Sequence, residues 1–318
     1  MDSDEAFLSG LLLLMVISVG LELSAQVQSV SPEHVLRAVL DVKRLADAAD
    51  KLDSDALEYC GSTHRAAITS SDVEESISEY LLKPGQLVPD TLPASNVWMV
   101  RNRISGVLHF VVLNALECAT QADSRKGARE AAVRAMDIAA NLGRARENLG
   151  ALALQQTKWQ EGEPLALAPD VGKGPIERVS SETILRASLE MESEAQIADN
   201  ADVDVASGRC DPWKGAHLTA ANLHKDISEY LLVPGGHSPI YIPASNVWFV
   251  TRYVLAGEFH AATGAAICAL DAGRKKKAVQ LGMKAYDAYK ALKASRERFE
   301  ELALQQTRWE EQHAMREQ

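Results

Sequence analysis

The residues that could do chemistry in this chain lie around a hexapeptide, PASNVW, that occurs at 93–98 and again at 243–248. A helix that begins here would expose backbone N–H groups, and such groups hold anions or carboxylates. Polar and aromatic side chains around both copies therefore predict one ligand pocket per copy, at the helix N-terminus. The candidate ligand-binding residues are Glu79, Tyr80, Ser95, Asn96 and Trp98, with Glu229, Tyr230, Ser245, Asn246 and Trp248.

The same residue types also suit a purely structural role. Pro93 would turn the chain, Ser95 would act as the N-cap, and Trp98 would fill core volume near the end of a bundle. We keep both interpretations open at this stage.

No other constellation supports catalysis or metal binding. His217 and His224 are seven residues apart, but Pro212 and Gly215 interrupt any helix that would join them to Cys210. The sequence has no phosphate-binding loop, no nucleophile elbow and no dinucleotide fingerprint. We therefore expect no catalytic residue, no metal site and no cofactor, and the assignment as an enzyme stays uncertain, leaning against one.

The hexapeptide recurs because a much longer segment recurs at an offset of 150 residues. ISEYLLKPG at 77–85 matches ISEYLLVPG at 227–235, and LALQQTKWQE at 152–161 matches LALQQTRWEE at 302–311. This period exceeds that of solenoid repeats, which run about 20–50 residues. The sequence predicts two copies of one domain: unit 1 at 30–161 and unit 2 at 179–318, joined by a Pro/Gly linker at 162–178 and preceded by a hydrophobic segment at 1–29.

The cysteines follow the same offset, with Cys60 matching Cys210 and Cys118 matching Cys268. Four cysteines in 318 residues, without any CxxC spacing, do not suggest a disulfide scaffold or a zinc site. We expect reduced thiols that pack as small apolar residues in a cytoplasmic protein.

Each unit is predicted to be all-α, because no segment alternates strictly between polar and apolar residues. In unit 1 we expect helices at 32–52, 71–82, 95–122 and 126–160. The third helix has an apolar face spaced by three and four residues, and the fourth has a coiled-coil-like seam. The face contains Val97, Val100, Ile104, Val107, Val111, Ala115 and Cys118, and the seam includes Leu142 and Leu149. These patterns predict a bundle of about four helices per unit, with the units related by pseudo-twofold symmetry, and an additional hydrophobic N-terminal helix.

Residues 6–21 are apolar without interruption, yet Glu22 ends the run before the length of a membrane span. We favour a buried helix, and keep a membrane anchor and a cleaved signal peptide as alternatives. Acidic residues precede this run, whereas a signal peptide begins with a basic region.

The charge balance favours a protein partner over a nucleic acid. The net charge is −11, which repels phosphate backbones and suits solubility or a basic partner. The first functional hypothesis is a non-catalytic acidic interaction module of the immunity, antitoxin or adaptor kind, with an oligomer possible. The alternatives are a small-ligand-binding protein or enzyme with the pocket described above, and a helical protein anchored in a membrane by residues 6–21.

Overall fold

A computed structural model describes residues 27–60, 70–83, 85, 87–121, 127–162, 176–207, 219–251, 254 and 276–314. Within these ranges the protein is all-α, with eight α-helices, two short π-helical segments and no strand. The α-helices are α2 (Pro32–Cys60), α3 (Ser70–Ser76), α4 (Ala94–Gln121), α5 (Ala128–Gly162), α6 (Ser181–Ser207), α7 (Thr219–Asp226), α8 (Ala244–Val250) and α10 (Lys276–Ala314). The π-helical segments are η1 (Ile77–Leu81) and η2 (Ile227–Leu231).

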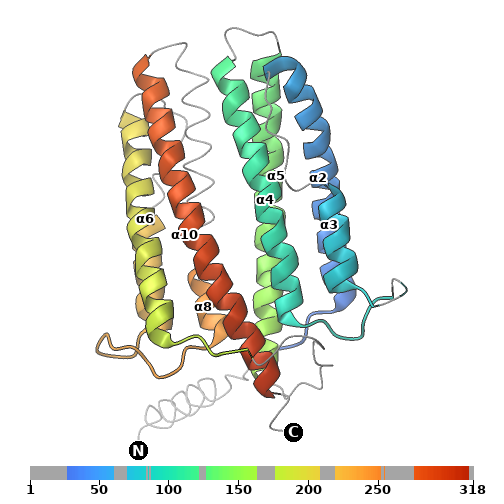
Figure 1. Cartoon of the computed structure of the whole chain (residues 1–318), viewed down its shortest axis with the longest axis vertical. Coiled ribbons are helices and arrows are strands. Elements are labelled where there is room, and N and C mark those ends of the chain that lie inside the picture. Colours follow the sequence, from blue (N-terminus) through green and yellow to red (C-terminus); the bar gives the residue numbers. More distant parts are fainter. Residues whose placement is uncertain are drawn as a thin grey trace, which may run out of the picture.

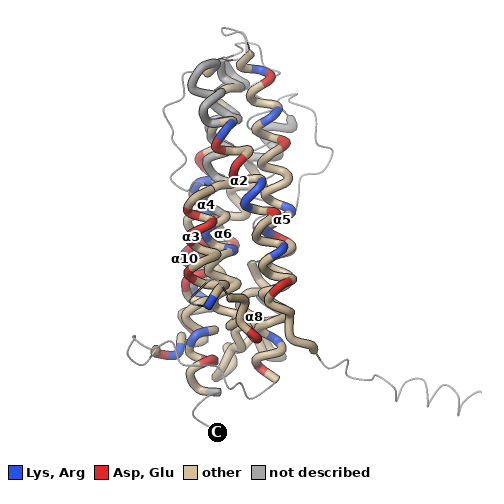
Figure 2. Tube along the Cα trace, turned by 90° about the vertical axis from the view of Figure 1, so that its right-hand side faces the viewer, with Lys and Arg blue, Asp and Glu red and all other residues tan. Residues whose placement is uncertain are grey.

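Two groups of helices stand side by side (Figure 1). One group contains α2, α3, α4 and α5, and the other contains α6, α7, α8 and α10. The groups contact each other through α10 with α4 and through α5 with α8. We call the end where α4 and α8 begin, and where α5 and α10 finish, the base. Lysine, arginine and acidic residues are interspersed along the helices, without a face of one sign in this view (Figure 2).

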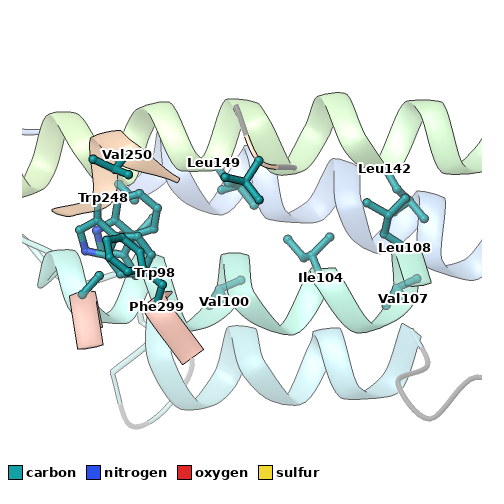
Figure 3. Packing of buried hydrophobic residues seen from close by; sticks show 14 of the residues in the cluster. Trp98, Val100, Ile104, Val107, Leu108, Leu142, Leu149, Trp248, Val250 and Phe299 are labelled. Carbon is teal, nitrogen blue, oxygen red and sulfur yellow. The ribbon is translucent and has the colours of Figure 1, made fainter. Parts of the chain in front are cut away.

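The apolar spacing seen in the sequence correctly identifies the buried face of α4. Val97, Val100, Ile104, Val107 and Val111 are all buried, and several of them are labelled in Figure 3. They pack against Leu142 and Leu149 of α5, which belong to the predicted seam of that helix. The regular spacing therefore fixes which side of each long helix faces the core.

Both copies of ISEYL form a π-helical segment rather than the end of an ordinary helix. The chain then becomes extended at Leu82 and at Leu232 and makes a tight turn closed by one bridge, Lys83 with Leu87 in one case and Val233 with His237 in the other. The turns need a positive φ at Gly85 (84°) and Gly235 (97°), which explains the glycine of each PG pair. These turns carry the chain from the short helices to the PASNVW copies.

The expectation of reduced thiols is wrong for one pair of cysteines. Cys60, the last residue of α2, forms a disulfide with Cys118 near the end of α4. Both residues are buried against Ala128, Ala131 and Ala132 at the start of α5, so they do pack in an apolar environment. Sequence spacing missed the bond because 58 residues separate the two cysteines. They meet only because α2 and α4 pack side by side with their C-terminal ends together. Cys210 and Cys268 lie outside the described residues.

The hydrophobic segment at 1–29 lies almost entirely outside the described residues, so the structure does not test the interpretations of residues 6–21. Among the helices that the structure describes, none combines the length and the apolar character that crossing a membrane requires.

The disulfide should contribute measurably to stability because it closes a loop of 58 residues in the unfolded chain. We expect the double substitution Cys60→Ala and Cys118→Ala to lower the free energy of unfolding by about 2–4 kcal/mol, measured by urea denaturation. Peptide mapping under non-reducing conditions should recover the two cysteines in one linked peptide. Recovery of both as alkylated free thiols would contradict the bond.

Candidate functional site

The N-terminus of α4 is held by a carboxylate from the other group of helices. Glu311, on the last turn of α10, accepts hydrogen bonds from the backbone N–H of Ser95 (3.1 Å) and from its hydroxyl (2.7 Å). A carboxylate is favourable here because the helix dipole places partial positive charge at this end. Ser95 thus joins α4 to α10 through a bond between residues that are 216 positions apart in sequence.

The same arrangement recurs 150 residues away with the roles exchanged. Glu161, at the end of α5, accepts from the backbone N–H of Ser245 (2.8 Å) and from its hydroxyl (2.7 Å). Each group of helices therefore supplies the acidic residue that caps the PASNVW helix of the other group.

The prediction that Ser95 is an N-cap residue is wrong. The helix begins at Ala94, one residue earlier, so Ser95 lies inside the first turn. In α8 the cap position is Pro243, whose side chain makes no capping bond. The orphan N–H groups of both helices are instead satisfied by distant side chains, which local sequence cannot reveal.

Other polar residues that recur at the offset of 150 positions also make internal hydrogen bonds. The Asn96 amide donates to the carbonyl of Tyr80, and Asn246 donates to the carbonyl of Tyr230. Gln156 accepts from Val30 N–H and donates to the carbonyl of Leu92. Its counterpart, Gln306, does the same with Val179 and Ile242. These bonds tie the first hexapeptide segment to η1 and α5, and the second to η2 and α10.

The two tryptophans of the hexapeptides stack on each other between the two groups of helices (Figure 3). Their ring centroids are 3.7 Å apart and the rings are nearly parallel, at 6°. Trp98 and Trp248 are 2% and 1% exposed, and their indole N–H groups donate to the hydroxyls of Thr157 and Thr307. Neither ring is open to a ligand from solvent.

A buried ion cluster lies beside the tryptophan stack. Glu300 of α10 contacts Arg101 of α4 (2.7 Å), Arg146 of α5 (3.1 Å) and Arg296 of its own helix (2.6 Å). The Arg101 guanidinium also lies 5.0 Å from the Trp98 ring centroid and 5.9 Å from that of Trp248. All four charged side chains are at most 5% exposed. The cluster therefore links the two groups of helices through charge and through the aromatic faces.

The arginines determine the ionisation of Glu300. Burial alone would raise the pKa of this carboxyl, but the positive charges of Arg296, Arg101 and Arg146 outweigh it and lower the pKa to about 2. Glu300 is therefore ionised at neutral pH.

The cluster is not the same in the two units. Arg146 corresponds to Arg296, but the position of Arg101 holds Thr251 in unit 2, and the position of Glu300 holds Gly150 in unit 1. A Cβ atom at Gly150 would lie 3.1 Å from Arg101 Nε, so the glycine makes room for the arginine. One arginine and one glutamate, each present in only one unit, therefore meet across the boundary between the units.

A pocket of about 420 Å³ opens at the base, next to the threonines that bind the tryptophans. It is bounded by the last turns of α5 and α10 and by the segment that leads into α8. The lining residues are Thr157, Gln160, Glu161, Tyr241, Pro243, Thr307, Trp309, Glu310, Glu311 and His313. Three of them are glutamates, and Trp309 and Tyr241 bring aromatic rings that lie 6.0 Å apart.

Three groups in this pocket have shifted pKa values. Burial, and secondarily the Glu161 charge, raises the pKa of Glu310 to about 7, although hydrogen bonds from Tyr241, Ala244 and Gln306 oppose the shift. Burial also raises the pKa of Glu161, which hydrogen bonds from Ser245 oppose. The Tyr241 hydroxyl donates to Glu310 and its pKa is far above the ordinary value, first because it is buried and then because of the Glu310 charge. Glu310 is thus the carboxyl here whose charge changes near neutral pH.

The structure brings together only some of the residues that the sequence selected as ligand-binding. Asn96 meets Tyr80, and Asn246 meets Tyr230, whereas Trp98 and Trp248 meet each other. Glu79 and Glu229 are exposed. None of the ten selected residues lines the 420 Å³ pocket.

Sequence reasoning missed the residues that line this pocket and those that form the ion cluster. The match between LALQQTKWQE and LALQQTRWEE already contains Glu161, Glu310 and Glu311. One sequence signal could have found Arg101 and Glu300. Each carries a charge where the matching position 150 residues away carries none, since Thr251 matches Arg101 and Gly150 matches Glu300. Among the residues that the structure describes, no group of histidine, cysteine and acidic side chains could hold a metal ion.

A scan against protein-family models and searches of curated proteins and of solved structures found no match to this chain.

Removing the charge of Glu300 should strongly destabilise the fold. We expect Glu300→Gln to lower the free energy of unfolding by about 3–5 kcal/mol at pH 7, because three buried arginines lose the carboxylate between them. Since the folded-state pKa is lowered to about 2, the wild-type stabilisation is complete above about pH 4.5 and is lost as the pH falls toward 2. Urea denaturation across this range should show that loss in the wild type and not in the variant. The exposed neighbour Glu301 provides the control Glu301→Gln, and equal effects of the two substitutions would refute the role of the cluster.

Two glycines of α5 allow a matched comparison. An added Cβ meets no atom within 4 Å at Gly143, whereas at Gly150 it meets Arg101. Alanine is favoured over glycine in a helix by about 0.5–1 kcal/mol, so Gly143→Ala should raise the free energy of unfolding by that amount. Gly150→Ala should be less stable than Gly143→Ala by about 1 kcal/mol or more, because it displaces the arginine. An equal gain for both variants would show that Arg101 does not need the space at Gly150.

Proposed function

We propose that this protein is a non-catalytic interaction module that binds a basic protein partner at its base, in the manner of an immunity, antitoxin or adaptor protein. The observation that carries the proposal is a large exposed apolar side chain beside the acidic pocket. Ile240 is 91% exposed and is followed directly by Tyr241, which lines the pocket. Exposed apolar residues next to aromatic and charged groups are typical of protein interfaces.

The two turns at the base extend this surface. Leu87 (64% exposed) and Val88 (37%) lie in the turn after η1, and Val233 (40%) lies in the turn after η2. Both turns project from the same end of the helices (Figure 1). Together with Glu161, Glu310 and Glu311 they offer apolar contacts around an acidic centre, which suits a partner that is basic and partly apolar.

We further propose that the chain is a tandem duplication folded as a fused dimer with pseudo-twofold symmetry. The exchanged caps support it, since Ser95 with Glu311 and Ser245 with Glu161 are the two bonds that a twofold axis would relate. The roles of Gln156 and Gln306, and of Asn96 and Asn246, recur in the same way. In this arrangement the base lies on the axis, so a partner would contact both units.

A ligand site at each hexapeptide is a weaker alternative. The anion-binding N–H groups of Ser95 and Ser245 already bind the carboxylates of Glu311 and Glu161. A ligand would have to displace a side chain of the protein itself.

We also propose an oxidising compartment rather than the cytoplasm. The cytoplasmic expectation depended on reduced cysteines, and the Cys60–Cys118 disulfide favours a location where such bonds persist.

Site-specific crosslinking tests the interaction face. A photoreactive amino acid at position 240 should crosslink a basic protein in extracts of the native organism. The control places the same residue at Val133, which is also exposed (44%) but lies in the first turns of α5, away from the base. The same products from both positions, or none from position 240, would contradict the proposed interaction face.

A further inference from the structure

We propose that the pocket at the base is a binding site for an arginine side chain, with its guanidinium group between the carboxylates and its neighbouring carbonyl group bonded to Gln160. This inference rests on the proposed function, because it assigns the arginine to the basic partner. It adds the chemical group that the pocket recognises and the residues that recognise it.

One carboxylate of the pocket, Glu310, has capacity to accept further hydrogen bonds. Glu310 accepts hydrogen bonds from the Tyr241 hydroxyl, from Ala244 N–H (2.8 Å) and from the Gln306 amide (3.4 Å). All three reach the oxygen Oε1, so the second oxygen, Oε2, accepts none of them. A guanidinium group presents several N–H donors in one plane and pairs well with carboxylates that lie close together.

The wall of the pocket is aromatic as well as acidic. Trp309 lies with its ring centroid 6.0 Å from that of Tyr241 and stacks on His313 at 4.2 Å. Guanidinium groups bind to the faces of such rings through cation–π attraction. The protein already places one arginine, Arg178, 5.9 Å from the Trp309 ring.

Gln160 provides an independent indication that a ligand completes this site. Its Oε1 accepts from Ala94 N–H (3.1 Å), which fixes the orientation of the amide. Its Nε2 is buried and has no hydrogen-bond partner. Gln160 as a whole is only 8% exposed, yet it belongs to the lining of the pocket. A buried donor without an acceptor is unfavourable and uncommon. A carbonyl oxygen next to the bound cation would satisfy it, as the backbone of an arginine residue can.

The counterpart positions show that the two units contribute different side chains to this pocket. Glu310 corresponds to Gln160, and Tyr241 corresponds to Thr91. The extra carboxylate and the phenol ring therefore come from unit 2, and the donor amide comes from unit 1. This difference also supplies a mild variant: Glu310→Gln installs the residue that unit 1 already has, and keeps an oxygen that can accept from Ala244 N–H.

Calorimetry on the full-length protein tests the inference with two probes of matched shape. Acetyl-arginine methylamide should bind, whereas acetyl-citrulline methylamide, which replaces the guanidinium by a neutral urea, should not. We expect Glu310→Gln to weaken arginine binding by about tenfold or more. The control Glu301→Gln removes a charge from an exposed position outside the pocket lining and should bind as the wild type does.

Binding should also become tighter as the pH rises from 6 to 8, because Glu310 ionises near pH 7. The other charged or titratable groups around it are Glu161 and Lys158 of α5, Glu311 and His313 of α10, Tyr241, and Arg178. The Glu310→Gln variant should lose most of this pH dependence while the control keeps it.

The inference is overturned if the folded wild type binds neither probe, binds both equally, or keeps its affinity in Glu310→Gln. Urea denaturation of each variant shows whether it is folded. If Glu310→Gln does not fold, the comparison of the arginine and citrulline probes on the wild type decides the inference. If crosslinking at position 240 captures a basic partner while the arginine probe does not bind, the interaction face is supported and the arginine site is refuted. If the arginine probe binds while no partner is captured, the arginine site is supported and the proposed interaction face is refuted.

Discussion

The arrangement of this protein depends on one buried carboxylate. Glu300 lies within ion-pair distance of three arginines that come from α4, α5 and α10, and each of these charges would be costly to bury alone. The tryptophan stack lies directly beside it, with Arg101 against both rings. The position of one group of helices relative to the other is therefore set by an interaction that works in a single geometry. Apolar packing alone would tolerate more sliding of the helices than ion pairs from one carboxylate to three arginines do.

This geometry has a consequence for the base of the molecule. When the tryptophans stack, the last turns of α5 and α10 come level with the beginnings of α8 and α4. Glu161 and Glu311 can then cap the helix of the opposite group. The same closeness gathers the glutamates and aromatic rings around one pocket. Burial in that position, rather than any feature of the local sequence, raises the pKa of Glu310 to about 7.

Differences between the two units are as informative as their similarities. The residues shared by both units make the internal bonds that each helix entrance needs, such as those of Asn96 and Gln156. The residues found in one unit only lie where the units meet, as Arg101 and Glu300 do, or in the pocket, as Tyr241 and Glu310 do. In the duplication that we propose, a copy of unit 1 paired with itself would bring arginines together without Glu300. The differences would then favour pairing of the two units within one chain.

The sequence by itself determined the all-α class, the long helices and their buried faces, because three- and four-residue spacing is a local property that burial must respect. The helix limits agree closely, except that α2 continues to Cys60 instead of ending near residue 52. Only the tertiary structure decided which carboxylate caps Ser95, which cysteine meets Cys60 and what Trp98 stacks on. These partners are 58 to 216 positions apart, and periodicity within one helix carries no information about which distant side chain will face it.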